Sequence, residues 1–168
     1  MKKQIETERK YLIKMPDLSY LRGILGYTES DITQIYLNSE PGKTHRVRKR
    51  EYSDKTVYIE NRKTRLSRVS VIEEEREITA PEFESLSLKI ANGSHPVLKK
   101  RLTLPYNGYT LEVDIYPQWK STAVLEVELE SEDASPEFPP EIEIIKEVTG
   151  EKRYSNHSMS FDFPEEIV

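Results

Sequence analysis

The sequence predicts an antiparallel α+β fold, and three features point to that class. Several short segments carry charged residues at every second position, which is the period of a β-strand with two unlike faces. Turn signals such as Asn107-Gly108 separate successive segments, as in hairpins and meanders. Two other stretches have the apolar period of a helix and stand between hairpins. We therefore expect about eight strands and two or three helices.

The first half of the chain is predicted to form a meander interrupted by helices. Strands are expected at residues 5–13, 33–37, 45–50, 57–59 and 71–78, with a basic loop or strand end at 62–69. Asp17 or Ser19 can cap a short helix whose leucines fall at i, i+3 and i+7, and Gly26 ends it. A second helix starts at Pro81, a residue suited to a first helical turn, and stops at Asn92-Gly93.

The second half begins with a hairpin, because strand-like residues 97–105 and 109–116 flank the Asn107-Gly108 turn. Residues 124–130 form the last predicted strand. The acidic, proline-rich residues 131–140 are expected to form a loop, and a short helix is expected at 141–149. Helices and loops thus connect antiparallel hairpins throughout the chain.

Size and composition limit the possible functions. A chain of 168 residues suits a single domain spanning 1–168, since a domain of that length buries roughly 70% of its unfolded surface. The 25 Lys and Arg residues are outnumbered by 30 Asp and Glu residues, which argues against a general nucleic-acid binder. The chain has no cysteine, which excludes disulfides and thiolate metal sites. Because no apolar run suits a signal peptide or a membrane span, we expect a cytoplasmic protein that binds neither membranes nor nucleic acid.

The alternating charges are sorted by sign from strand to strand. The sets of one sign are Arg46, Arg48 and Arg50; Lys99 and Arg101; Glu73, Glu75 and Glu77; Glu112 and Asp114; and Glu126, Glu128 and Glu130. The first strand mixes both signs, with Glu6, Glu8 and Lys10 on one face. For any one strand, a face in water is the simpler explanation. Strands of a single sign are less typical of a solvent face, and about eight strands that closed into a barrel would enclose room for one small ligand.

The two sets of charges match two kinds of ligand. Clustered Arg and Lys side chains fit a polyanion such as a triphosphate, because a guanidinium can donate two hydrogen bonds to phosphate oxygens. Clustered carboxylates fit hard cations such as Mg²⁺ or Mn²⁺, which prefer oxygen ligands. A metal and a triphosphate together would neutralise both sets, whereas an empty charged interior would be unstable.

Taken in order, these motifs resemble the triphosphate tunnel metalloenzymes, also called CYTH proteins. The resemblance covers nearly the whole chain, and it rests on E-x-E-x-K at Glu6 to Lys10, Gln34-x-Tyr36-Leu37, Arg46-Val47-Arg48, Glu73-x-Glu75, Lys99-x-Arg101, Glu112-x-Asp114, Glu126-Val127-Glu128, Glu147-Val148-Thr149 and Arg153-Tyr154-Ser155-Asn156. It implies an eight-stranded antiparallel β-barrel that forms a tunnel with a charged interior and has helices packed outside. It also implies hydrolysis or rearrangement of triphosphate compounds with a divalent metal.

The resemblance assigns roles to individual residues. The implied metal ligands are Glu6, Glu8, Glu126 and Glu128, with Asp114 and Glu75 as further contributors. The implied phosphate-binding cations are Lys10, Arg46, Arg48, Lys63, Lys99, Arg101 and Arg153. Catalysis is expected from Glu6, Glu8, Lys10, Glu126 and Glu128, with Mg²⁺ or Mn²⁺ as the cofactor.

The chain departs from the family pattern at two positions. Asn61 stands where the family often has threonine, and Val71 stands where it has an arginine two residues before the second E-x-E motif. Arg68, displaced by a shifted loop, is one possible replacement for that arginine. One phosphate contact of the family is thus left without an assigned residue.

The expected activity is metal-dependent hydrolysis of the terminal phosphoryl group of a triphosphate, with inorganic triphosphate as the favoured small-molecule substrate. A class IV adenylyl cyclase and a thiamine triphosphatase are alternatives, and each needs room for an organic group. Tyr116 and Trp119 could stack on such a group or pack at the barrel rim. A non-catalytic module that binds polyphosphate or organic phosphates is an alternative of another class. The three histidines, His45, His95 and His157, have no metal-ligand spacing and are predicted to be surface residues.

Overall fold

The computed structural model describes the backbone of residues 2–167 and the side chains of residues 4–167. Over this range the elements are, in order, β1 Lys2–Lys14, α1 Leu18–Arg22, β2 Thr28–Leu37, β3 Lys43–Glu51, β4 Thr56–Arg65, β5 Ser70–Ile78, α2 Ala80–Ser87, β6 Val97–Tyr106, β7 Tyr109–Ile115, β8 Thr122–Glu128, β9 Ile144–Glu147, the 3₁₀ turn η1 Lys152–Tyr154 and α3 Asn156–Phe161. Among the described residues, no helix is long and apolar enough to cross a membrane.

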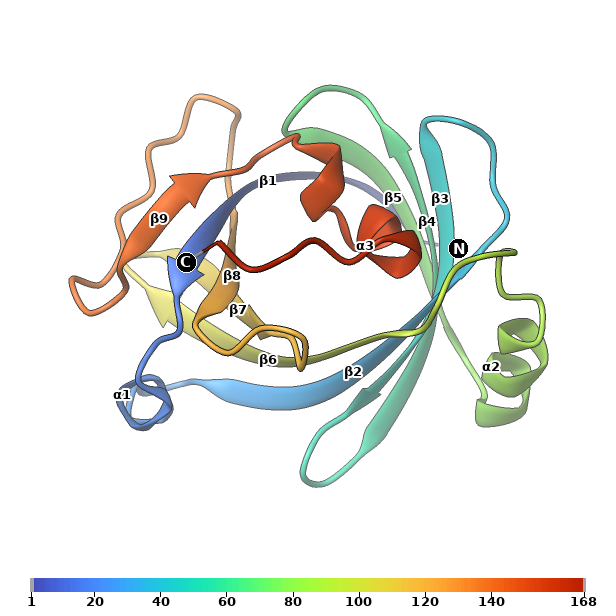
Figure 1. Ribbon diagram of the computed structural model, residues 1–168, viewed down its shortest axis with the longest axis horizontal. Helices are drawn as coiled ribbons and strands as arrows, with labels where there is room; N and C mark the ends of the chain where they lie inside the picture. Colours follow the sequence, from blue (N-terminus) through green and yellow to red (C-terminus); the bar gives the residue numbers. More distant parts are fainter. Residues whose placement is uncertain (1, 168) are drawn as a thin grey trace.

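The strands form a closed antiparallel barrel, as the resemblance implied (Figure 1). Their order is β5-β4-β3-β2-β6-β7-β8-β1, and β1 also pairs with β5. The long strand β1 closes the barrel because its first half, Lys2–Thr7, pairs with β5 and its second half, Glu8–Lys14, pairs with β8. The ninth strand, β9, is an addition that pairs with Tyr11–Ile13 of β1. The predicted fold class is therefore confirmed.

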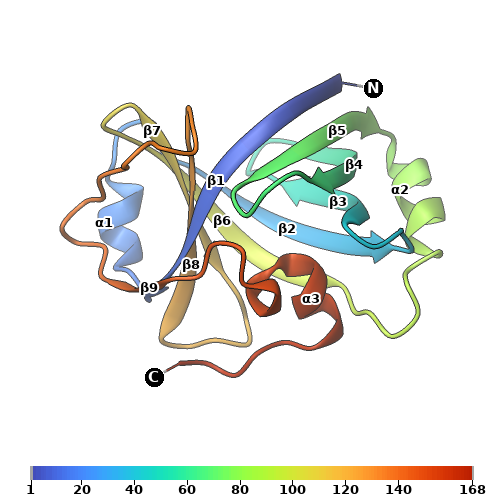
Figure 2. The same cartoon turned by 90° about the horizontal axis from the view of Figure 1, so that it is seen from above.

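The apolar side chains point outward from the barrel and are covered there. α1 and the loop before β9 cover β6, β7 and β8, where Leu21 and Ile142 join a cluster of buried strand residues. α2 covers another part of the barrel, with Phe83 against Val47. These two helices lie on opposite sides of the barrel (Figure 2). Because alternate residues of each strand face opposite sides, this outer core leaves the charged residues inside.

The C-terminal segment covers one opening of the barrel. In Figure 1 the view runs into the barrel, and α3 lies across its mouth. A third apolar cluster holds this segment in place and includes Tyr154 and Met159 packed with Tyr116 and Trp119. Trp119 also donates an indole hydrogen bond to the carbonyl oxygen of Pro164, at 3.0 Å. Tyr116 and Trp119 are thus packing residues at the rim, and the alternative that they stack on an organic substrate is wrong.

The prediction of a helix at residues 141–149 is wrong. This segment contains β9 instead, which lies against an edge of β1 that β5 has left free. Its two adjacent isoleucines favour an extended strand, and tertiary pairing outweighs the weak helical pattern. The predicted loop at 131–140 is confirmed as irregular structure.

The helix boundaries differ from the predictions by a few residues. α1 is capped by Asp17, whose carboxylate accepts from the Ser19 amide at 2.9 Å, but it ends at Arg22 and leaves Leu25 94% exposed. α2 starts as predicted, with a capping box between Thr79 and Glu82. β2 begins at Thr28, earlier than predicted, and β4 extends to Arg65, so much of the basic segment is strand.

Candidate functional site

A cavity of about 290 Å³ lies inside the barrel. All eight barrel strands contribute polar side chains to its wall, and the start of α3 adds the rest. Its lining comprises Gln4, Glu6, Glu8, Lys10, Tyr36, Thr44, Arg46, Arg48, Arg50, Lys63, Arg65, Glu73, Glu75, Lys99, Arg101, Glu112, Glu126, Glu128, Ser155, Asn156 and His157. The strand period of two brings the alternating charges of the sequence to this one wall.

Most of the residues predicted for the site meet in this cavity. From the predicted metal set, the cavity is lined by Glu6, Glu8, Glu75, Glu126 and Glu128. From the predicted phosphate set, it is lined by Lys10, Arg46, Arg48, Lys63, Lys99 and Arg101. Asp114 and Arg153 are not brought to the cavity wall. The roles of the converging residues remain predictions.

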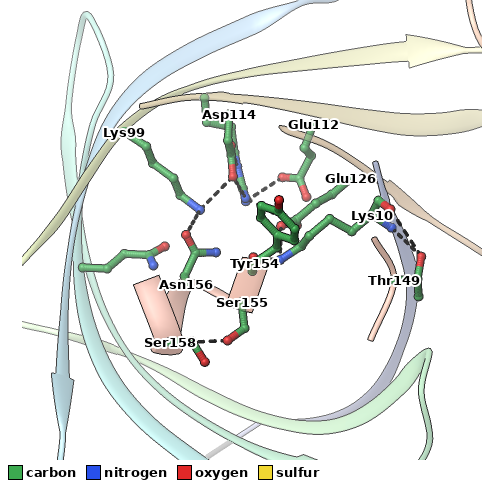
Figure 3. Close-up of polar contacts among 12 residues, drawn as sticks. Lys10, Lys99, Glu112, Asp114, Glu126, Thr149, Tyr154, Ser155, Asn156 and Ser158 are labelled. Atoms are coloured by element: carbon green, nitrogen blue, oxygen red, sulfur yellow. Dashed lines mark hydrogen bonds and ion pairs between the residues drawn. The ribbon is translucent and has the colours of Figure 1, made fainter. Parts of the chain in front are cut away.

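Asp114 lies behind the wall as a counterion. Its side chain is fully buried, and one oxygen accepts from Lys99 Nζ at 2.8 Å, while both oxygens accept from the Arg101 guanidinium at 2.7 and 2.8 Å (Figure 3). Burial alone would raise the pKa of Asp114, but Arg101 and Lys99 hold it well below its usual range. Burial also lowers the pKa of Lys99 to about 7. In this structure Asp114 therefore orients two cations behind the cavity wall, and its predicted contribution to a metal site stays a prediction.

Neither Arg153 nor Arg68 lines the cavity. Arg153 is exposed, and its guanidinium stacks on the ring of Tyr154 at 4.6 Å. The side chain of Arg68 is 59% exposed and donates to the carbonyl oxygen of Thr149 at 3.0 Å. In this structure Arg153 packs on the C-terminal segment, and its predicted phosphate contact stays a prediction. Arg68 does not line the cavity, so it does not take the place of the arginine expected at Val71.

Lys10 is held in place by the C-terminal segment. Its backbone N–H donates to Thr149 Oγ1 at 2.9 Å, and its Nζ donates to the carbonyl oxygen of Tyr154 at 3.1 Å (Figure 3). The carboxylate of Glu126 lies 3.5 Å from the same Nζ. Residues that are 139 and 144 positions away in the sequence therefore set where this ammonium lies.

The carboxylates of β1 and β8 face one another across a strand pair. Glu8 is directly opposite Glu128, and Lys10 is opposite Glu126. Burial raises the pKa of Glu8 to about 8, and the carboxylate of Glu126 adds to this rise. Burial also raises the pKa of Glu6, against the opposing effect of Lys63, and raises that of Glu128 with help from Glu112. These groups are crowded carboxylates that resist ionisation together.

This acidic side is the part of the cavity that could hold a metal. Within the described residues, no three His, Asp or Glu side chains already form a metal site. The donor chemistry nevertheless fits, because Glu6, Glu8, Glu126 and Glu128 offer oxygen ligands from adjacent strands to a hard cation. A bound divalent cation would offset the burial of Glu8 and its repulsion by Glu126, which together raise the pKa of Glu8.

The arginines of β3 form a contrasting basic side. The Nε atoms of Arg46 and Arg48 are buried and have no hydrogen-bond partner among the described residues. The acidic group nearest to Arg48 is Glu75, at 3.8 Å. Burial, followed by the neighbouring charges of Arg46 and Arg101, lowers the pKa of Arg48 to about 10. Positive charge on this side is therefore only partly neutralised by the described residues, which favours the binding of an anion.

Several lining residues were not predicted as site residues. Arg50, Glu73 and Glu112 continue the alternating sets, so strict use of the strand period would have found them. Tyr36 and Asn156 belong to motifs that carry the resemblance, but they were given no role in the site, and Arg65 was placed in a basic loop or strand end. His157 is half-buried, lines the cavity and packs edge-on against Tyr36 with ring centroids 5.2 Å apart.

The surface prediction for the histidines holds for one of the three. His157 is at the cavity wall, and His45 is half-buried with its Nε2 2.7 Å from Glu60 Oε2. The prediction is wrong for both. His95 is exposed, as expected.

No family model and no curated protein matches the sequence. Among solved structures, the inorganic triphosphatase NE1496 is 27% identical, with a TM-score of 0.60 and coverage of 95% of this chain and 96% of that one. The PH1819 protein from Pyrococcus horikoshii shares the fold at 16% identity and a TM-score of 0.58, over 76% of this chain and 80% of its own. A Bacillus halodurans protein provisionally named an adenylate cyclase also shares the fold, at 14% identity and a TM-score of 0.54. The match covers 100% of this chain and 95% of that one. The charged barrel and these neighbours together show that the chain has the triphosphate tunnel metalloenzyme (CYTH) fold.

Proposed function

We propose that this protein hydrolyses the terminal phosphoryl group of a triphosphate, with inorganic triphosphate as its substrate and Mg²⁺ or Mn²⁺ as its cofactor. The observation that carries the proposal is the division of one cavity into two sides: one where the buried Nε atoms of Arg46 and Arg48 have no hydrogen-bond partner among the described residues, and one of crowded carboxylates. The inorganic triphosphatase activity named for NE1496, which aligns with nearly the whole chain, supports it.

The basic side is suited to hold the triphosphate. Arg46 and Arg48 are buried, so their guanidinium groups lose little further hydration when they donate to phosphate oxygens. Lys99 and Arg101 are aimed by Asp114, which fixes their positions before an anion arrives. A phosphoryl transition state is stabilised mainly by positioning and by neutralised charge, so donors fixed in advance favour the reaction.

The acidic side is suited to the metal. Glu6, Glu8, Glu126 and Glu128 would hold it, because they offer oxygen donors from the paired strands β1 and β8. Burial, followed by neighbouring carboxylates, raises the pKa values of Glu8 and Glu128. When bound, a divalent cation neutralises phosphate oxygens and makes water a better nucleophile. Lys10, fixed by Thr149 and Tyr154, places an ammonium between this side and the phosphates.

The residues that line the cavity favour an inorganic substrate over the organic alternatives. Tyr116 and Trp119 are 1% and 4% exposed, so neither offers a ring face to a nucleobase or to thiamine. The cavity wall is dominated by charged side chains, whereas a site for an organic group is usually lined mostly by apolar ones.

Product analysis tests the proposal. The purified protein is incubated with inorganic triphosphate, ATP or thiamine triphosphate, in Mg²⁺, in Mn²⁺ or in a chelator. Phosphate, pyrophosphate and cyclic AMP are then measured. We expect phosphate release from inorganic triphosphate that needs the metal. Cyclic AMP as the main product would instead favour the cyclase, and tight binding without turnover of any substrate would favour a binding module.

The Glu8→Gln and Glu128→Gln variants provide the matched test of the metal side. Each keeps the size of its side chain and removes one carboxylate, so we expect loss of metal-dependent phosphate release in a folded protein. Full activity in both variants would contradict the assignment of these residues.

A further inference from the structure

Arg65 belongs to a row of directly opposite residues on the neighbouring strands β4, β5 and β1. It is the last residue of β4 and lies directly opposite Val71 of β5, which in turn lies opposite Glu6 of β1. Residues directly opposite one another in an antiparallel pair share a face, so Arg65 faces inward with Glu6. The side chain lines the cavity.

In the neighbouring row of β4 and β5, the basic residue has carboxylate partners, which Arg65 lacks. There, Lys63 lies opposite Glu73 and forms ion pairs of 3.3 Å with both Glu73 and Glu6. Val71 cannot neutralise Arg65 in this way, because its side chain is apolar. No carboxylate of the described residues lies within ion-pair distance of the Arg65 guanidinium, and its contacts are to the carbonyl oxygens of Ser67 and Arg68, at 3.4 and 3.3 Å.

The guanidinium of Arg65 is therefore weakly held on a well-fixed backbone. Both contacts are longer than the usual N–H···O distance, and both come from the same Nη1 atom. The Arg65 amide itself donates to the carbonyl oxygen of Gly42 at 3.0 Å, which secures the end of the strand. The residue is exposed, so its side chain can turn toward an anion without first breaking a buried ion pair.

We propose that Arg65 is a substrate-positioning residue that binds a phosphate group of the triphosphate at the β4–β5 end of the cavity. It adds an exposed cation to the buried arginines of β3, Arg46 and Arg48. Val71, directly opposite Arg65, is apolar, so the positive charge in this row of inward-facing residues comes from Arg65. This inference rests on the proposed function for its substrate, but the binding of inorganic triphosphate tests it separately.

The test compares Arg65→Gln with Arg68→Gln. Arg68 is also a basic residue of this segment, but it points outward to Thr149, so it is the matched control. We expect Arg65→Gln to raise both the KM and the dissociation constant for inorganic triphosphate about tenfold, as loss of a charge-assisted hydrogen bond should. The same constants should change less than about twofold in Arg68→Gln, and thermal unfolding should show that both variants are folded.

A position exchange sharpens the test. Opposite residues in such a pair have Cβ atoms roughly 5 Å apart, so an arginine at either position can reach the same space. The double variant Arg65→Val, Val71→Arg should therefore bind inorganic triphosphate within about threefold of the wild-type protein. If the double variant fails to fold, Val71→Glu provides a second measurement, because a new carboxylate opposite Arg65 should weaken binding as Arg65→Gln does.

The outcomes separate this inference from the proposed function. Wild-type binding of inorganic triphosphate in Arg65→Gln would overturn the inference, even if the enzyme hydrolyses the compound. Conversely, weakened binding in Arg65→Gln with no hydrolysis by any form of the protein would support the role of Arg65 and refute the proposed function.

Discussion

The two basic sides of the cavity are built from the same kinds of residue but are neutralised differently. On β6, Lys99 and Arg101 are tied to the buried carboxylate of Asp114 at 2.7 to 2.8 Å. On β3, Arg46 and Arg48 have unpartnered Nε atoms, and Arg48 has an acidic neighbour only at 3.8 Å. An alternating basic strand can thus be either a pre-arranged structural unit or an open anion site. The counterion, not the cation, distinguishes the two.

Removing the counterion should have the largest effect. Asp114→Asn keeps the shape of the side chain but removes the carboxylate that pairs with buried Lys99, and it leaves Arg101 with only Glu112 at 2.9 Å and Glu126 at 3.6 Å. We expect the free energy of unfolding to fall by about 3–5 kcal/mol, the usual cost of breaking a buried ion pair from one side. Urea denaturation measures this change. A loss below about 1 kcal/mol would mean that Asp114 is not the structural counterion of this wall.

On β3, removing a charge should lower activity and leave stability unchanged or higher. Arg48→Met removes a buried charge and fills a similar volume, so the free energy of unfolding should stay constant or rise. Binding should suffer instead, with kcat/KM for inorganic triphosphate reduced about 100-fold, because more than one charge-assisted hydrogen bond is lost. Steady-state kinetics and urea denaturation of the same sample check both parts. Destabilisation with normal kinetics would remove the distinction between the two sides.

The acidic side should give stability a distinct pH dependence. The folded pKa of Glu8, about 8, lies above its unfolded value of 4.5, so its protonated form is favoured by folding. The corresponding stability is present below pH 4.5 and is lost as the pH rises toward 8, by at most about 1.4 kcal/mol per pH unit for one proton. Glu8→Gln should therefore be more stable than the wild-type protein at pH 8 and similar to it near pH 4.5. If the free energies of unfolding of the two proteins differ by the same amount at every pH, the pKa of Glu8 is not raised by folding.

Removing the hydrogen bond between Thr149 and the Lys10 backbone should change stability and activity least. Thr149→Val removes the hydroxyl that accepts the Lys10 N–H, so we expect a loss of about 1 kcal/mol in the free energy of unfolding. A lower kcat should accompany it, and Thr149→Ser should restore both. Thr122→Val, which removes a hydroxyl bonded to Ile167 outside the cavity, is the control. If Thr149 acts through Lys10, its substitution should have no further kinetic effect in a Lys10→Ala background.

The sequence predicted which faces of the strands are charged, because side-chain direction follows a local period of two. That period led to Glu6, Glu8, Arg46 and Glu126 and to the class of fold. It could not separate Asp114 from Glu112, since both alternate on the same strand, and only their partners from β6 show that Asp114 is a buried counterion. Such pairing depends on three-dimensional packing.

The other differences also come from contacts between distant segments. β9 was predicted as a helix because its pairing with β1 is invisible locally. Arg68 was considered as a replacement for the arginine missing at Val71, whereas strand register puts Arg65 directly opposite Val71. His157 gave no signal, since its place at the cavity depends on how α3 crosses the barrel mouth.

The double pairing of β1 has a consequence for the order of folding. The first strand of the chain must wait for β5, whose Ser70 is 63 residues from Thr7, and for the segment around Tyr154, 144 residues from Lys10. Closing such long loops costs entropy before any contact is gained, so folding dominated by these pairings is slow. The hairpins from β2 to β5 and from β6 to β8 can form first as local units. We therefore expect closure by β1 to assemble the barrel and its cavity late in folding, because both halves of β1 need partners that are distant in the sequence.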